Sequence, residues 1–163
     1  MAASKHISQE VRNAFAKKTQ GVGIMCLPFE SNYDKDEEYL LVHTNIVIPF
    51  YYTYSFWRDV IKIDTQIQTA LASGDIVART ASNKFFSGNW ETITVWKNEQ
   101  AIKNFYTKGE HAKVMMKWTS YMKAGENYMI LRYKIQGKDM DIKGYRQTKT
   151  FFAMVKAGAL ELA

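Results

Sequence analysis

The clearest pattern in the chain runs from residue 39 to residue 135, where the spacing of apolar positions alternates between strand-like and helix-like. Residues 39–48 are apolar and β-branched and end at Pro49, which predicts a strand. Residues 55–73 predict a helix that stops before Gly74. Its apolar positions recur every three or four residues: Phe56, Val60, Ile63, Ile67 and Leu71.

The second half of this region repeats the alternation. Residues 75–82 and 89–96 predict two neighbouring strands, and residues 128–135 predict a fourth. Between them, a long helix is expected to begin at an Asn98 cap with Glu99 near its positive end. We expect Gly109 to divide this helix and Gly125 to end it. On a single helical wheel, one apolar side is made of Ala101, Phe105, Ala112 and Met116.

The order strand, helix, strand, strand, helix, strand predicts an α+β fold, the ferredoxin-like βαββαβ sandwich. Each helix has one apolar stripe, so the two helices are expected to cover one face of the sheet. Large apolar side chains are also assigned to the other face: Trp90, Trp96, Tyr39 and Leu41. An uncovered face of this kind predicts a homodimer that closes sheet against sheet, a dimeric α/β barrel.

The pattern divides the chain into three parts. Residues 1–38 are predicted to form an accessory N-terminal segment, with a short helix capped by Ser8 and a short strand over 21–28. Residues 39–137 form the ferredoxin-like domain. Residues 138–163 form a C-terminal extension, with an edge strand predicted within 144–156.

Composition agrees with one ordinary domain. The chain has 163 residues, of which 47% are hydrophobic and 23% charged, which excludes disordered and collagen-like classes. Cys26 stands alone and cannot form an internal disulfide, so a reducing, cytoplasmic setting is expected. No run approaches the roughly 20 apolar residues of a membrane span, and the N-terminus lacks a signal-peptide pattern, so no membrane partner is predicted.

The positive charge is uneven. The net charge is +6, and residues 97–156 carry 13 basic and 5 acidic side chains. A basic chain invites a nucleic-acid hypothesis. Most of these basic residues are lysines scattered singly, whereas phosphate or base recognition favours clustered arginine or a glycine-rich loop. A solvated lysine surface is therefore the preferred interpretation, with no nucleic-acid partner.

Few side chains qualify for chemistry. The sequence contains no glycine-rich phosphate loop, no Cys/His metal spacing and no Ser-His-Asp arrangement. His111 flanks the apolar stripe of the second helix. Such a position suits a proton acceptor or an axial ligand at the edge of a pocket. It is also typical of an ordinary histidine at the boundary between core and surface. His43 and Asn45 interrupt an apolar strand. The amide of Asn45 needs partners, from a neighbouring loop or from a polar pocket.

Aromatic residues gather between the first strand and the first helix. Residues 50–54 contain four aromatic rings, more than a core connection requires. Tyr51, Tyr52 and Tyr54 are therefore predicted to form the rim of a pocket for a flat or apolar ligand. Trp96 is either a core residue or a wall of the same pocket.

One stretch resembles a known family. Residues 92–105, which read Thr-Ile-Thr-Val-Trp-Lys-Asn-Glu-Gln-Ala-Ile-Lys-Asn-Phe, are followed by His111. This resembles the antibiotic-biosynthesis-monooxygenase-like dimeric α/β-barrel superfamily, in a branch similar to the spheroidene-type monooxygenases. In that branch a helix histidine follows the strand tryptophan, with an aromatic two turns on, here Trp118. The resemblance covers about residues 39–135.

The resemblance implies roles for several positions. Asn45 matches the strand asparagine of the haem-degrading members, a distal polar group. Phe105 stands where those members have a tryptophan that distorts the ring, and Met115 stands where they have the iron-binding histidine. His111, one turn earlier, is then the candidate haem ligand if haem is bound. The substrate-binding set implied is Trp96, Phe105, Met115, Trp118 and the three tyrosines.

These observations predict a monooxygenase that acts on an aromatic, polyketide-like or isoprenoid small molecule, with no cofactor or with haem. His111 or His43 is the expected base, and Asn45 the hydrogen-bond donor to a developing oxyanion. The alternative is a non-catalytic small-molecule-binding or stress-related protein on the same scaffold.

Overall fold

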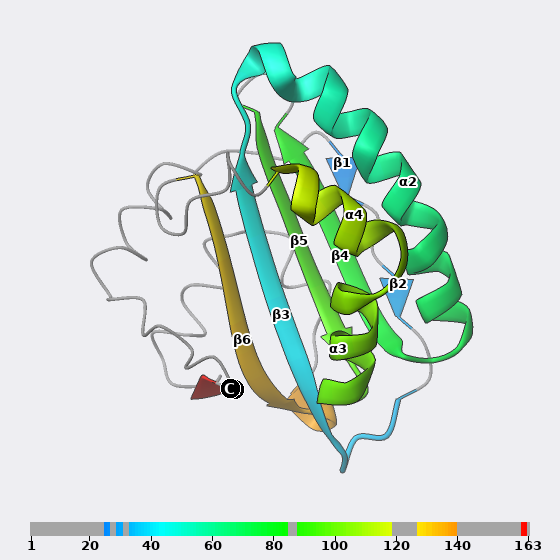
Figure 1. Cartoon of the computed structure of the whole chain (residues 1–163). Helices are drawn as coiled ribbons and strands as arrows, with labels where there is room; N and C mark the ends of the chain where they lie inside the picture. The colour runs from blue at the N-terminus through cyan, green and yellow to red at the C-terminus, as the bar shows by residue number, and fades with distance from the viewer. Residues whose placement is uncertain are drawn as a thin grey trace.

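The computed structural model describes residues 25–26, 29–30, 33–84, 88–118, 127–139 and 161–162. Its centre is a sheet of four long antiparallel strands (Figure 1): β3 (Glu38–Val47), β4 (Ile76–Lys84), β5 (Asn89–Trp96) and β6 (Tyr128–Gln136). Their spatial order is β4-β5-β3-β6, so β5 and β3 occupy the middle. This is the order of a ferredoxin-like sheet, which confirms that part of the predicted fold class.

Three short strands extend the sheet at its two edges. β1 (Met25–Cys26) and β2 (Phe29–Glu30) both pair with β4, and β7 (Glu161–Leu162) pairs with β6. The strand predicted over 21–28 therefore contributes two paired residues. The predicted helix near Ser8, the edge strand within 144–156 and the helix end at Gly125 lie outside the described residues.

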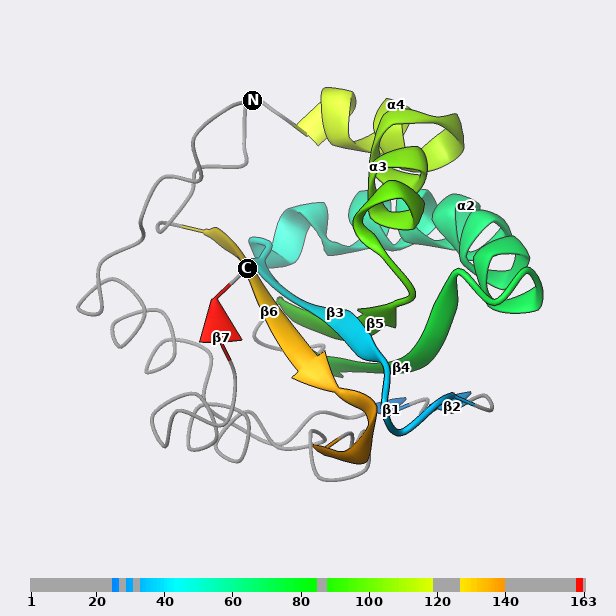
Figure 2. The same ribbon diagram turned by 90° about the horizontal axis from the view of Figure 1, so that it is seen from below.

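The helices form one layer over one face of the sheet (Figure 2). The first is α2 (Thr53–Ala72), preceded by the 3₁₀ turn η1 (Phe50–Tyr52). The predicted second helix is two helices, α3 (Glu99–Thr107) and α4 (Gly109–Trp118). A 3₁₀ turn, η3 (Gly137–Asp139), follows β6. Among the described residues, no helix is both long and apolar enough to cross a lipid bilayer.

Local sequence explains where α3 begins and where it breaks. The Asn98 side chain accepts a hydrogen bond from the Ala101 backbone N–H at 2.9 Å, which confirms the predicted cap. Gly109 has a φ of +75°, a left-handed conformation that residues with a side chain rarely adopt. The break also corrects the wheel drawn for a single helix: Met116 is 70% exposed, because α4 restarts with its own phase and buries Val114 and Trp118 instead.

The core on the helix side of the sheet is divided into two clusters. The first lies against α3 and contains Val42, Ala70, Ile76, Trp96, Ala101, Ile102 and Phe105. The second lies against α4 and the start of α2 and contains Ile48, Phe56, Trp90, Val114 and Trp118. Ile63 of α2 packs against both clusters. The helix layer is therefore packed at two places rather than along one continuous seam.

The opposite face of the sheet requires a correction. The sequence interpretation grouped Trp90 and Trp96 with Tyr39 and Leu41, yet the two tryptophans belong to the helix-side clusters. Tyr39 and Leu41 do face the other way, in a third cluster with Ile93, Val95, Met129, Leu131, Tyr133 and Ile135. All of these side chains are at most 3% exposed in the single chain. A bare apolar face thus gives no reason for a homodimer, which stays an untested prediction.

Candidate functional site

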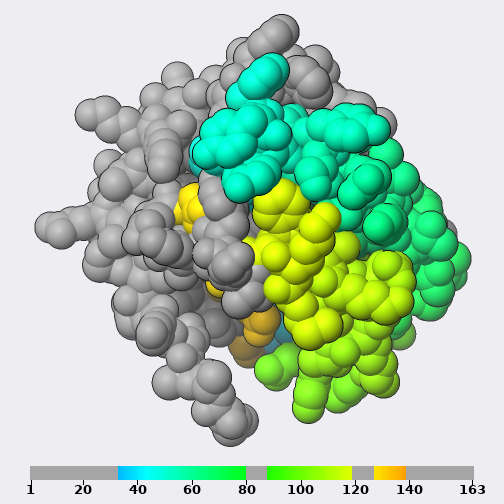
Figure 3. All heavy atoms as spheres, turned by 45° about the horizontal axis from the view of Figure 1, so that its top comes forward, coloured from blue at the N-terminus to red at the C-terminus, as the bar shows by residue number. Residues whose placement is uncertain are grey.

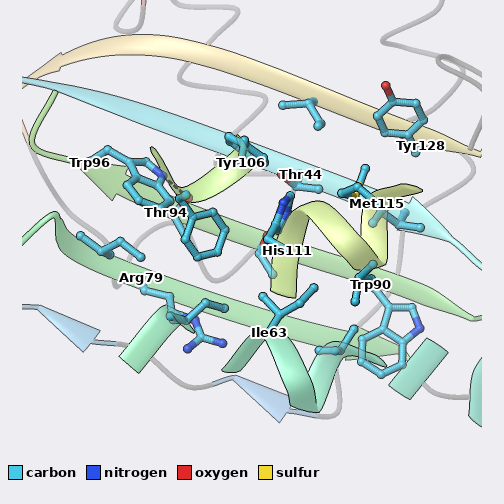
Figure 4. Close-up of a pocket in the computed structure, with 18 of the residues that line it drawn as sticks. Thr44, Ile63, Arg79, Trp90, Thr94, Trp96, Tyr106, His111, Met115 and Tyr128 are labelled. Carbon is cyan, nitrogen blue, oxygen red and sulfur yellow. Dashed lines mark hydrogen bonds between the residues drawn. The ribbon is translucent and has the colours of Figure 1, made fainter. Parts of the chain in front are cut away.

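A cavity lies between the helices and the sheet, where the two helix-side clusters meet (Figure 4). Its volume is about 140 Å³. The sheet supplies the floor, with Thr44 and Ile46 of β3, Trp90, Thr92, Thr94 and Trp96 of β5, and Ile130 of β6. These positions share one face of the sheet because side chains alternate along a strand and the register pairs Thr44 with Thr92 and Ile130.

The helices supply the walls of the cavity. The stripe predicted on α2 lines one side through Phe56, Val60, Ile63 and Ile67. α3 contributes Phe105 and Tyr106, and α4 contributes His111, Val114 and Met115. Four residues singled out from the sequence therefore meet at one cavity: Trp96, Phe105, His111 and Met115.

His111 is the polar group most enclosed by aromatic rings. Its imidazole packs against Phe105, with centroids 4.8 Å apart, and against Tyr106, with centroids 4.6 Å apart in an edge-on arrangement. The Nδ1 atom is buried and has no hydrogen-bond partner. Burial lowers the pKa of His111 to about 4, so the imidazole is neutral at pH 7. A neutral imidazole carries one N–H donor and one lone pair, and can donate or accept a hydrogen bond.

Gln66 of α2 fixes the turn that carries His111. Its side-chain amide donates to the carbonyl oxygens of Phe105 and Lys108, at 3.0 and 2.9 Å. Its Oε1 accepts the backbone N–H of His111 at 2.9 Å. One side chain thus satisfies backbone groups at the end of α3 and at the start of α4, which helix ends leave without intrahelical partners.

Two other polar side chains around the cavity are engaged, whereas the indole N–H of Trp90 is buried without a partner. The Trp96 indole donates to Thr94 Oγ1 at 2.8 Å. Burial raises the pKa of the Tyr106 phenol, and a hydrogen bond with Thr44 and the charge of Arg132 offset this only in part. The phenol therefore stays protonated at neutral pH. These bonds orient the floor and leave His111 with an unused polar atom.

Arg79 is a lining residue that the sequence interpretation missed. It lies on β4 opposite Thr94 of β5, and its side chain is 13% exposed. Its Nε–H is buried without a partner, while Nη1 lies 3.4 Å from Asp64 Oδ1. The signal in the sequence was an isolated arginine inside a predicted strand, between Ala78 and Thr80.

His43 and Asn45 lie on the far face of the sheet, away from the cavity. In the antiparallel register, Thr44 lies between them and points to the helix side, so both of its neighbours point away. His43 Nε2 lies 2.7 Å from Glu91 Oε1, and both side chains are buried. The amide of Asn45 is fully buried and neither of its polar atoms has a hydrogen-bond partner. The structure therefore does not bring these two residues together with His111 at the cavity.

The predicted aromatic rim is also displaced. Tyr51, Tyr52 and Tyr54 are 77%, 43% and 78% exposed and do not line the cavity. Tyr52 packs instead on Trp118 of α4, with centroids 5.9 Å apart. The start of α2 (cyan) and α4 (yellow) lie side by side on the surface (Figure 3).

Trp118 joins α4 to α2 and does not line the cavity. Its buried indole donates to Asp59 Oδ2 at 3.1 Å, and Lys117 donates to the same oxygen. Burial raises the pKa of Asp59, but the bonds from Lys117 and Trp118 outweigh it and hold the pKa below its ordinary value. The carboxylate thus ties down the helix that carries His111.

No three His, Cys, Asp or Glu side chains gather as a metal site within the described part of the chain. No protein-family model and no curated protein sequence matches this chain. Two crystal structures are similar in backbone, both described as "putative monooxygenase", from Lactobacillus acidophilus NCFM and from Fusobacterium nucleatum. Each has a TM-score of 0.49 and 11% sequence identity, and they cover 66% and 68% of this chain. The match covers 47% of each of those chains, about half their length.

Proposed function

We propose that this protein binds a compact, largely apolar molecule between its helices and its sheet and acts on it as a monooxygenase. The observation that carries the proposal is the His111 imidazole, which has an unpartnered Nδ1 in the wall of a largely apolar cavity. A buried polar atom without a partner costs about 1–3 kcal/mol. A ligand that hydrogen-bonds to His111 removes that cost.

The size of the cavity favours a single ring. A cavity of about 150 Å³ lined by apolar side chains holds benzene, and this one measures about 140 Å³. Trp96 and Phe105 provide aromatic walls, with centroids 5.0 Å apart and ring planes tilted by 57°. Of the predicted ligand classes, a monocyclic aromatic or enolisable ring suits this space better than a polyketide-like or isoprenoid molecule.

Haem does not fit the same space. Pockets for drug-sized ligands measure roughly 300–1,000 Å³, and haem is at least as large as such ligands, whereas the cavity measures about 140 Å³. Met115, where the resemblance expects an iron-binding histidine, is a weak thioether ligand in the cavity wall. The proposed reaction therefore uses no haem.

The proposed chemistry is oxygenation of an activated CH₂ group by molecular oxygen. Neutral His111 accepts a proton from the ring carbon. The carbanion then reduces O₂; one oxygen atom becomes the new carbonyl oxygen, and the other leaves as water with the two hydrogens of the CH₂ group. Support for this reaction class comes from the resemblance of residues 92–111 to the monooxygenase superfamily.

Non-catalytic binding is the second candidate, and the low pKa of His111 favours it. A general base is most effective when its pKa lies near the working pH. A histidine with a pKa of about 4 is a weak base at pH 7. It hydrogen-bonds a ligand well but removes a proton only from an acidic carbon.

A direct experiment uses 1,3-cyclohexanedione, a single ring with an acidic CH₂ group, at pH 5, where much of the diketone is still undissociated and His111, with a pKa of about 4, is mostly neutral. Binding is followed through the tryptophan fluorescence, since Trp90 and Trp96 line the cavity, and turnover through O₂ uptake and the mass of the product. The proposal expects both signals in the wild type, with turnover lost in His111→Phe and kept in the control Met116→Leu on the exposed side of α4. Binding without O₂ uptake supports the second candidate, and no binding contradicts both.

A further inference from the structure

We infer that the cavity selects an anion: a single ring bearing one carboxylate, bound by the guanidinium of Arg79. The inference rests on the proposed function in one respect, that the cavity binds a small molecule. It adds the chemical class of that molecule and the residue that recognises it.

The first observation is the incomplete pairing of Arg79. Its side chain is 13% exposed, and the Nε–H is buried without a partner. Nη1 has a long contact of 3.4 Å with Asp64, whose side chain is 50% exposed. A guanidinium presents five N–H donors and is expensive to bury unless they are paired. The contact to Asp64 leaves the buried Nε–H unsatisfied.

The second observation is that one edge of the Arg79 guanidinium is left unused by its contact with Asp64. Because Asp64 contacts Nη1, the edge formed by Nε and Nη2 is not used by that contact. Arginine binds carboxylates through two parallel N–H···O bonds along such an edge. A carboxylate placed there takes up the buried Nε–H in the same interaction.

The third observation is the charge of the remaining lining. Among the described residues that line the cavity, none is Asp or Glu. His111 is neutral at pH 7 because burial lowers its pKa to about 4. An anion entering the cavity thus meets one full positive charge, from Arg79, and no carboxylate in the wall. In a partly desolvated space this arrangement favours an anion over its neutral analogue.

The two polar features can serve one ligand. Figure 4 shows Arg79 and His111 among the side chains of the same cavity, with the aromatic pair Trp96 and Phe105 also lining it. A ring fits against the aromatic walls, with its carboxylate at Arg79 and a second polar substituent at His111. This division of labour, with apolar walls and a few polar groups that fix orientation, is typical of small-molecule sites.

The experiment compares benzoate with benzamide, its neutral analogue of the same shape, at pH 7 by tryptophan fluorescence. We expect benzoate to bind the wild-type protein about tenfold more tightly or better, since a hydrogen bond to a charged group is worth more than a neutral one. Arg79→Met keeps an unbranched side chain and removes the guanidinium with its charge; it is expected to abolish the preference while benzamide still binds. Arg58→Met, on the exposed side of α2, is the matched control and keeps the preference.

A second variant tests the inference without altering the cavity wall. Asp64→Asn removes the negative charge beside the guanidinium, so benzoate affinity is expected to rise several-fold. Equal binding of benzoate and benzamide by the wild type overturns the anion inference but leaves the proposed function standing. Unchanged benzoate preference in Arg79→Met overturns the assignment of Arg79. Failure of both probes to bind overturns the proposed function, and this inference with it.

Discussion

The backbone N–H of His111 donates to the side chain of Gln66, 2.9 Å away on another helix. The histidine that the sequence singled out is thus positioned by a residue 45 places earlier in the chain. Gln66 also binds the carbonyl oxygens of Phe105 and Lys108, so it connects α2 to both sides of the α3–α4 break.

Replacing Gln66 tests this connection. Gln66→Met preserves the side-chain volume and removes three hydrogen bonds. We therefore expect the free energy of unfolding, measured by urea titration, to fall by about 1–3 kcal/mol. The His111 imidazole NMR signals are expected to shift as well. Gln68→Met is the control: Gln68 is exposed and makes one long bond of 3.5 Å, to Asp64. Equal losses in the two variants contradict a positioning role for Gln66.

Two glycines with the same backbone conformation provide a matched pair. Gly109 and Gly74 have φ values of +75° and +76°. A Cβ at Gly109 lies 2.9 Å from Gln66 Oε1, whereas a Cβ at Gly74 meets nothing within 4 Å. Each change to alanine is expected to cost about 1–2 kcal/mol in backbone strain. Gly109→Ala is expected to cost more and to weaken ligand binding, measured by urea unfolding and by probe fluorescence; identical behaviour contradicts the role of the Gln66 contact.

The lowered pKa of His111 predicts a pH dependence of stability. The unfolded chain binds a proton at His111 below its ordinary pKa of 6.5, while the folded protein does so only near 4. Stability therefore falls as the pH drops from 6.5 to 4 and levels off below that, by roughly 3 kcal/mol from this group. Urea unfolding of the wild type and of His111→Phe across this range measures the difference. Parallel curves for the two proteins contradict the prediction.

Replacing Asn45 with an apolar residue is expected to increase the stability of the fold. Its amide is fully buried with no hydrogen bond, so Asn45→Leu, of similar shape, is expected to stabilise the protein by about 1–2 kcal/mol. Asn45→Asp is expected to destabilise it strongly, because the new charge faces Glu91 across the strand pair. Both are read from urea midpoints. Loss of ligand binding in Asn45→Leu with unchanged stability contradicts the assignment of Asn45 to the far face.

The sequence was sufficient for the elements and their order, because the apolar spacings, the Asn98 cap and the Gly109 break each have a local cause. Which face a strand residue occupies depends on register with other strands. The pairing of Thr44 with Thr92, rather than any property of Asn45 itself, sends Asn45 away from the cavity. For the same reason Arg79 was missed, because its place in the cavity depends on how α2 packs over β4, which the local sequence does not show. The roles of Trp96, Phe105, His111 and Met115 at the cavity stay predictions.

The glycine at position 109 decides where the His111 imidazole lies. In an unbroken α-helix, residues six places apart, such as Phe105 and His111, point about 120° away from each other and their rings do not touch. Here the rings pack with centroids 4.8 Å apart, because the helix is broken at Lys108, whose backbone is extended, and at Gly109, whose φ is +75°. A chain that extended this helix without interruption would keep every residue of the motif and still separate the histidine from the ring of Phe105.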